Sequence, residues 1–195
     1  MGEVRTFVHT GTRLDPDLWF AGLKRGNTFV SNGPALEFTV DGQMPGSEIS
    51  KERGSSVKVF AKVQGHPKVA FPRTLTISGG DGPLKEIDNA QQQSELVLEL
   101  TVPVQESQWL VASATCTNGA VAHSSPVYVI VDGRPFWSRT HGPALIEKQL
   151  EAIGQIEEEF SGWPDDPRSQ GIIERLGEAK KFYADLKNRI EEAGR

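Results

Sequence analysis

Apolar and polar residues alternate over most of the stretch from residue 36 to residue 131. A period of two is typical of a strand that buries one face, because successive side chains of a strand point to opposite faces. Turn-forming pairs such as Asp41-Gly42, Pro45-Gly46 and Asn118-Gly119 separate the alternating runs. The pattern predicts strands at residues 36–40, 57–63, 74–78, 96–102, 109–115 and 127–131, with a weaker candidate at 84–87. About seven short strands within about 100 residues are typical of an antiparallel β-sandwich of immunoglobulin-like type.

The beginning of the chain follows a different pattern. Residues 4–8 alternate as a short strand, and Asp15 followed by Pro16 favours the start of a helix. Gly26 favours the end of that helix, and the β-branched and aromatic residues 28–30 favour a second strand. The sequence therefore predicts a strand-helix-strand segment before the sandwich.

A rigid corner follows this segment at residues 31–34, where Ser-Asn-Gly-Pro must turn or kink the chain. We interpret it as a junction between structural units and expect three parts, residues 1–34, 35–133 and 134–195. The first part should bury apolar side chains on the sandwich or on a second copy of the chain, including those of Trp19 and Leu23.

The C-terminal part is rich in charge and has helical spacing. We predict one helix at residues 143–160 with an apolar face formed by Leu145, Gln149, Ile153, Ile156 and Phe160. A second helix begins after Asp165 and Asp166, with a stripe formed by Ile172, Leu176, Ala179, Tyr183, Leu186 and Ile190. Together they predict an αα-hairpin, flanked by Trp137 and Trp163 as packing anchors. So narrow a stripe must pack on the sandwich, on another domain or on a second copy, so a homo-oligomer through these helices is one expectation.

Composition excludes several classes of protein. The net charge of −5 argues against a nucleic-acid-binding protein. No apolar run reaches the length needed to span a bilayer, and the sequence shows no basic-apolar-small leader pattern. We therefore expect a soluble protein without a membrane partner. Its location stays unknown. Cys116 is the single cysteine and lies in an alternating run, where a small core residue is a simpler interpretation than a nucleophile.

Candidate chemistry is sparse. The four histidines, His9, His66, His123 and His141, lie far apart, and no H-x-H pair, P-loop or nucleophile elbow is present. His123 could be a ligand or acid-base group, but a hydrogen-bonded histidine at a strand end is the simpler interpretation. The residues alone therefore indicate a non-catalytic module.

Residues 19–34 resemble a run in metallohydrolases of the polymerase-and-histidinol-phosphatase (PHP) superfamily, in its carbaryl-hydrolase-like subgroup. There, a W-x-x-G-L-x-x-G-R-T-F-V-T-N-G-P run closes the catalytic domain and leads into a C-terminal β-domain. Residues 40–46, 122–129 and 132–135 are also similar, whereas Asn27 and Ser31 stand where Arg and Thr are commoner.

The resemblance implies a fragment without a cofactor of its own. In that family, His, Asp and Glu residues of the upstream barrel hold the divalent metal, so the partner of this chain would be its own upstream catalytic domain. The residues expected nearest a complete active site are Arg5, His9, Asn27, Ser31 and Asn32, unless they only shape the turn and the interface. A free-standing β-sandwich that binds carbohydrate or protein is the alternative, although no strand face carries an aromatic cluster. A small enzyme with converging histidines is a third interpretation.

Overall fold

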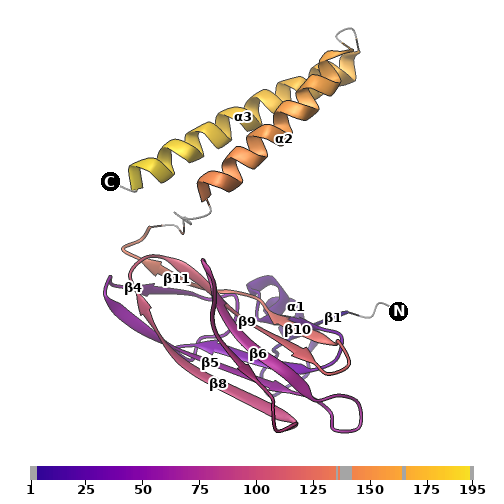
Figure 1. Ribbon diagram of the computed structural model, residues 1–195, viewed down its shortest axis with the longest axis vertical. Coiled ribbons are helices and arrows are strands. Elements are labelled where there is room, and N and C mark those ends of the chain that lie inside the picture. The colour runs from indigo at the N-terminus through magenta and orange to yellow at the C-terminus, as the bar shows by residue number, and fades with distance from the viewer. Residues whose placement is uncertain (1–3, 135, 137–141, 164–165, 194–195) are drawn as a thin grey trace. The chain divides into compact units, whose positions relative to one another are not determined.

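The structure is a computed structural model, and it describes residues 4–134, 136, 142–163 and 166–193 (Figure 1). The chain divides into two compact units, Met1–Phe136 and Trp137–Arg195. The first unit is mainly β and sandwich-like, and the second contains two helices. No helix among the described residues is both long and apolar enough to cross a membrane.

Two sheets form the first unit. The larger contains β1 (Arg5–Val8), β2 (Thr28–Ser31), β4 (Glu48–Lys51), β6 (Pro72–Gly79), β7 (Gly82–Asp88), β9 (Gln108–Cys116), β10 (Val121–Ser124) and β11 (Val127–Val131). The smaller contains β3 (Ala35–Val40), β5 (Ser55–Gln64) and β8 (Glu95–Val104). All pairs are antiparallel except β4 with β11, which run parallel.

Strand β9 organises the larger sheet. One of its edges pairs with β6, and the other pairs with β10 near its end and with β11 near its start. Ser125 and Pro126 separate β10 from β11, and proline cannot donate to a sheet ladder. One edge of β9 therefore carries two successive partners, of which β10 continues to β2 and β1 while β11 continues to β4.

The core lies between the two sheets and follows the alternation in the sequence. On β5 the side chains of Val57, Val59, Ala61 and Val63 are buried, whereas Lys58 between them is exposed. Each buried side chain of this size contributes about 1.5–3 kcal/mol. The strands predicted from alternation are present, and the weaker candidate is β7. Two four-residue strands, β4 and β10, were not predicted, whereas the equally short β1 and β2 were.

The first 34 residues join the larger sheet. Strand β2 pairs with β1 on one side and with β10 on the other. The turn after β2 carries the chain from the larger sheet to β3 of the smaller one, so the expected corner is real but connects two sheets of one unit. The expected limit at residue 34 thus lies inside the compact unit that ends at Phe136. Whether residues 1–34 close a catalytic domain stays a prediction.

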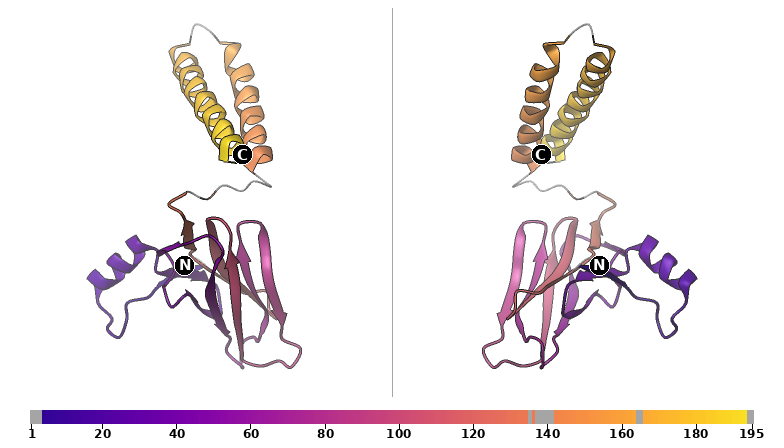
Figure 2. Two further views of the ribbon diagram at one scale, coloured as in Figure 1. Left: turned by 90° about the vertical axis from the view of Figure 1, so that its left-hand side faces the viewer. Right: turned by 90° about the vertical axis from the view of Figure 1, so that its right-hand side faces the viewer.

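Helix α1 (Pro16–Arg25) connects β1 to β2 and has both predicted caps. The Asp15 carboxylate accepts hydrogen bonds from the N–H groups of Asp17 and Leu18, and Gly26 ends the helix at φ 76°. Figure 2 shows α1 beside the sandwich and not across a sheet face.

In the second unit, α2 (Gly142–Ser161) and α3 (Pro167–Ala193) pack along each other (Figure 1). Their polar edges are joined by ion pairs from Lys180 to Glu157 and from Lys187 to Glu147. Asp166 caps α3 by accepting from the N–H of Arg168 at 3.0 Å, whereas Asp165 lies outside the described residues.

The face of α2 differs from the predicted one. Ile146 and Ile153 are buried, but Leu145 and Ile156 are 58% and 41% exposed. The predicted face is therefore correct at Ile153 and partly at Phe160, but wrong at Leu145, Gln149 and Ile156. Leu145 and Ile146 both fit a helical repeat that passes through Ile153, and the structure buries Ile146. The stripe predicted for α3 is half-buried or buried at every position. Trp163 was expected to be a packing anchor, but it is 56% exposed, and Trp137 lies outside the described residues.

Candidate functional site

Helix α1 is apolar on more sides than the sandwich covers. Leu18, Trp19, Phe20 and Leu23 spread over about half of the helix circumference, with Trp19 and Leu23 on the same side because they are four residues apart. Phe20 is 57% exposed and Leu23 is 40% exposed, whereas Trp19 is half-buried. Among the described residues, the expected burial is therefore partial at Trp19 and does not occur at Leu23. The charged residues Asp17, Lys24 and Arg25 lie on the other side of α1, so the helix is amphipathic. Leu18, Phe20 and Leu23 of its apolar side are exposed and have no full cover among the described residues.

Glycines, and not apolar side chains, hold α1 against the sandwich. A Cβ added to Gly22 would lie 2.6 Å from Cγ1 of Val8 and 3.0 Å from the carbonyl oxygen of His9. At the end of the helix, a Cβ on Gly46 would lie 1.9 Å from the carbonyl oxygen of Arg25. The backbone of α1 thus contacts the rest of the unit closely, while its large side chains remain on the outside.

A pocket of about 470 Å³ lies beside α1 and between the two sheets. Phe7 and Phe29 stack at its wall with ring centroids 4.8 Å apart and an angle of 7° between the rings. The other residues that line it are Val8, His9, Asn27, Thr28, Leu36, Glu37, Phe38, Met44, Pro45 and Ser124. This volume lies within the range of small-ligand pockets, and its wall is mainly apolar. We refer to the exposed apolar side chains of α1, which are Leu18, Phe20 and Leu23, together with Phe7 and Leu14, as the N-terminal apolar surface. Phe7 also lines the pocket.

The structure brings together two of the five residues expected near an active site. His9 and Asn27 both line the pocket, and the His9 N–H donates to the Asn27 carbonyl oxygen at 2.9 Å. Arg5 is exposed on β1, where it is paired with Ser31 of β2.

Ser31 and Asn32 contact the backbone of their own chain. The Ser31 hydroxyl is buried, donates to the Pro34 carbonyl oxygen at 2.6 Å and accepts from the Gly33 N–H at 2.9 Å. The Asn32 side chain accepts from the N–H of Val121 at 2.7 Å. Both residues therefore shape the corner between the sheets.

The described histidines do not converge. His66 accepts a hydrogen bond from the Lys68 N–H at 3.3 Å within its own loop, and His141 lies outside the described residues. His123 lies within β10 and is exposed, so it is not the hydrogen-bonded strand-end residue that was expected. Within the described part of the chain, no group of three or more His, Cys, Asp or Glu residues could hold a metal ion.

Cys116 is buried in β9, as predicted for a small core residue. Burial raises the pKa of the Cys116 thiol, because the thiolate is disfavoured away from water. A raised pKa lowers the fraction of nucleophilic thiolate at neutral pH.

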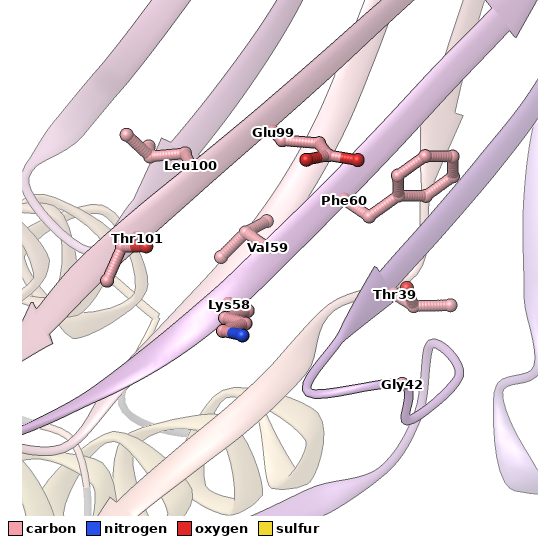
Figure 3. Close-up of a pocket in the computed structure, with 8 residues that line it drawn as sticks. All are labelled: Thr39, Gly42, Lys58, Val59, Phe60, Glu99, Leu100 and Thr101. Atoms are coloured by element: carbon pink, nitrogen blue, oxygen red, sulfur yellow. The ribbon is translucent and has the colours of Figure 1, made fainter.

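Two shallower hollows lie on the outer faces of the sheets. One, of about 420 Å³, crosses β3, β5 and β8 of the smaller sheet (Figure 3). Phe60 lies there between its cross-strand neighbours Thr39 and Glu99. Charged groups surround it, and Lys62 pairs with Glu37 at 3.0 Å on the same face. This face resembles an ordinary solvated surface.

The other hollow, of about 570 Å³, lies on the larger sheet. Its residues are Ser78, Gly82, Trp109, Val111, Ser113, His123, Pro126 and Tyr128. Trp109 and Tyr128 are direct neighbours across β9 and β11. No strand carries both rings, so no pattern within one strand predicts this pair. The register of β9 with β11 produces it.

Comparison with known proteins gives the architecture only. No protein-family model and no curated protein matches the chain. A fibronectin(III)-like module structure of Clostridium thermocellum CbhA is similar over 51% of this chain and 100% of the module, at 17% identity and a TM-score of 0.35. The CARDB domain of the Pyrococcus furiosus PF1109 protein is similar over 51% of this chain and 96% of that domain, at 17% identity and a TM-score of 0.31. At these values the similarities carry no information on function. The fold places this chain in the class of β-sandwich modules, with two additional C-terminal helices.

Proposed function

We propose that this chain is the C-terminal accessory part of a PHP-like metal-dependent hydrolase, with an immunoglobulin-like sandwich and no activity of its own. The observation that carries the proposal is the uncovered helix α1. The residues that resemble the end of a PHP catalytic domain, 19–34, include most of this helix, and the side chains of Leu18, Phe20 and Leu23 are exposed among the described residues. A catalytic domain that precedes β1 in a longer protein would be tethered beside the N-terminal apolar surface and could cover it.

The divalent metal and its ligands would belong to that catalytic domain. His9 and Asn27, at the rim of the pocket beside α1, would face the interface and could contact a substrate or support the domain contact. Arg5 lies at the other end of β1, opposite Ser31 of β2, and would face a different part of the interface. Ser31 and Asn32 would act indirectly, by holding the corner that positions β2.

Self-association through the helical hairpin is part of this proposal. Leu145 and Ile156 are eleven residues apart in sequence, which places them on one side of α2, and both are exposed. Sedimentation velocity of the Leu145→Ser/Ile156→Ser double variant tests it: a dimer that becomes a monomer supports the hairpin as the interface, and an unchanged sedimentation coefficient contradicts it.

The main test uses the coding region upstream of residue 1. We expect it to encode a domain with an H-x-H motif, and that domain, expressed separately, should form a complex with this chain. The Phe20→Ser/Leu23→Ser double variant should weaken the complex at least about tenfold, because two large apolar side chains lose their contacts. Val97→Ser is the matched control, since Val97 is an exposed apolar residue on β8, distant in sequence from α1. The proposal fails if no such domain is encoded, or if the isolated chain hydrolyses substrate with a metal held by its own imidazoles.

A free-standing binding module is the second candidate. The aromatic pair of Trp109 and Tyr128 on the larger sheet favours it. The two candidates are separated by the upstream sequence, because a binding module needs no H-x-H domain.

A further inference from the structure

The hollow on the outer face of the larger sheet has the composition of a binding site for an uncharged, hydroxyl-rich ligand. Trp109 and Tyr128 stand at one end, because their residues are direct cross-strand partners. Ser113 and His123 are cross-strand partners farther along β9 and β10. Ser113 lies four residues after Trp109, which separates the two pairs by about 13 Å along the strand.

The aromatic rings of this hollow are accessible. Tyr128 is exposed and Trp109 is half-buried. Neither ring contacts another aromatic ring of the described chain. The floor between the two pairs is apolar, since it contains Val111 and Pro126. Flat apolar surface is therefore available at one end, with polar groups around it.

The polar side chains that line this hollow can both donate and accept hydrogen bonds. Ser78, Ser113 and Tyr128 contribute hydroxyls, and His123 contributes an imidazole. None of these four side chains makes a hydrogen bond to another residue in the part of the chain that the structure describes. They are thus solvated and can exchange water for ligand hydroxyls without breaking an internal bond.

The absence of charged side chains from the described lining of this hollow favours uncharged ligands. No Asp, Glu, Lys or Arg lines this hollow, in contrast to the hollow on the smaller sheet, which contains Lys58 and Glu99. A charged ligand would lose hydration without gaining an ion partner. A polyproline peptide offers carbonyl acceptors but no backbone N–H donors, so the acceptor capacity of the serines would remain unused.

We propose that this hollow binds a neutral oligosaccharide, with one pyranose stacked on the ring of Trp109 and with hydroxyls of that sugar and its neighbours bonded to Ser78, Ser113 and His123. The C–H groups on one face of a pyranose present an apolar surface that packs on an aromatic ring through dispersion. The volume of about 570 Å³ is within the range of small-ligand sites. This inference is independent of the proposed function, because it uses neither α1 nor an upstream domain.

Isothermal titration calorimetry of the full chain tests it with cellohexaose, maltohexaose and xylohexaose at millimolar concentration. An oligogalacturonate serves as the charged probe and decaproline as the peptide probe. We expect saturable binding of at least one neutral oligosaccharide and none of the charged or peptide probes. Failure of all three neutral probes, or preferential binding of decaproline or the oligogalacturonate, overturns the proposal.

Variants locate the site. Trp109→Ala should weaken binding about tenfold, the loss expected when an aromatic contact of about 1.4 kcal/mol is removed. Tyr128→Phe keeps the ring and removes only the hydroxyl, so it should weaken binding less than Trp109→Ala does. This conservative variant still tests the site if Trp109→Ala does not fold. Phe60→Ala is the matched control, since Phe60 is an aromatic on the outer face of the other sheet. Equal weakening by Phe60→Ala, or unchanged affinity in Trp109→Ala with native circular dichroism, would exclude this hollow as the site.

Discussion

Asn32 and Val121 are 89 residues apart in the chain and are joined by two hydrogen bonds. The Asn32 side-chain oxygen accepts from the Val121 N–H at 2.7 Å, and the Asn32 N–H donates to the Val121 carbonyl oxygen at 3.2 Å. The corner after β2 is therefore fastened to the start of β10.

The first prediction concerns this fastening. Asn32→Ala should lower the free energy of unfolding by about 1 kcal/mol, because the Val121 N–H loses its acceptor. Asn32→Asp retains an acceptor oxygen at the same position and should cost less. Urea unfolding monitored by tryptophan fluorescence measures both. Equal losses in the two variants would show that the side-chain hydrogen bond is not the source of the effect.

The second prediction concerns the contact between α1 and the loop after β3. Gly46 has φ 86° and would place a Cβ 1.9 Å from the Arg25 carbonyl oxygen. Gly46→Ala should therefore lower the free energy of unfolding by about 2 kcal/mol or more.

Gly42 supplies the matched control for that prediction. It has φ 75°, and no atom lies within 4 Å of an added Cβ. Gly42→Ala should cost only the strain of the left-handed backbone, about 1 kcal/mol. Thermal unfolding followed by far-ultraviolet circular dichroism measures the difference, and a loss in Gly42→Ala as large as that in Gly46→Ala would contradict close packing of α1.

The third prediction concerns pH. Partial burial of Asp41 would by itself raise the pKa of its carboxyl. The hydrogen bonds from Lys51 and the Lys58 N–H, with the charges of both lysines, outweigh burial and lower this pKa below its ordinary value of 3.8. A group whose pKa is lower in the folded state contributes stability above its unfolded pKa and loses it as the pH falls through its folded pKa.

Asp41→Asn isolates this contribution, since asparagine tolerates the φ of 48° that Asp41 adopts. The variant should be less stable than the wild type by about 1 kcal/mol at neutral pH. The difference should shrink as the pH falls below 3.8. Urea unfolding at a series of pH values measures it, and a difference that does not change with pH would rule out the carboxylate as its cause.

The fourth prediction tests the face of α2. Ile153 is buried and Ile156 is exposed, although they are the same residue type one turn apart. Ile153→Ala should destabilise the hairpin by about 2 kcal/mol or more, and Ile156→Ala by a small fraction of that in the monomer. Helical ellipticity during thermal unfolding at low protein concentration reports on both. A loss at Ile156 as large as that at Ile153 would contradict the exposure of Ile156 in the structure.

The fifth prediction uses the single thiol. Cys116 is buried and its pKa is raised, so a disulfide reagent such as DTNB should label it slowly in the native chain and rapidly in denaturant. Native labelling at the rate of a free thiol would show that β9 opens readily.

Short-range patterns in the sequence were sufficient for most secondary structure. Alternation predicted the long strands, and Asp15, Pro16 and Gly26 predicted the limits of α1, because burial on a strand and capping of a helix depend on residues close in sequence. The short strands β4 and β10 were missed, although the equally short β1 and β2 were predicted. The choice between Leu145 and Ile146 on α2 also exceeded local information, since both residues fit a helical repeat that passes through Ile153.

The candidate sites depended on contacts between distant segments. His9 and Asn27 meet because β1 pairs with β2, whereas Trp109 and Tyr128 meet because β9 pairs with β11 in one particular register. The exposure of α1 follows from close approaches at Gly22 and Gly46, which the apolar composition of the helix does not reveal. Local propensity specifies which segments become strands and helices, but strand register and backbone approach bring residues distant in sequence together. Only the tertiary structure therefore decided which side chains share a surface.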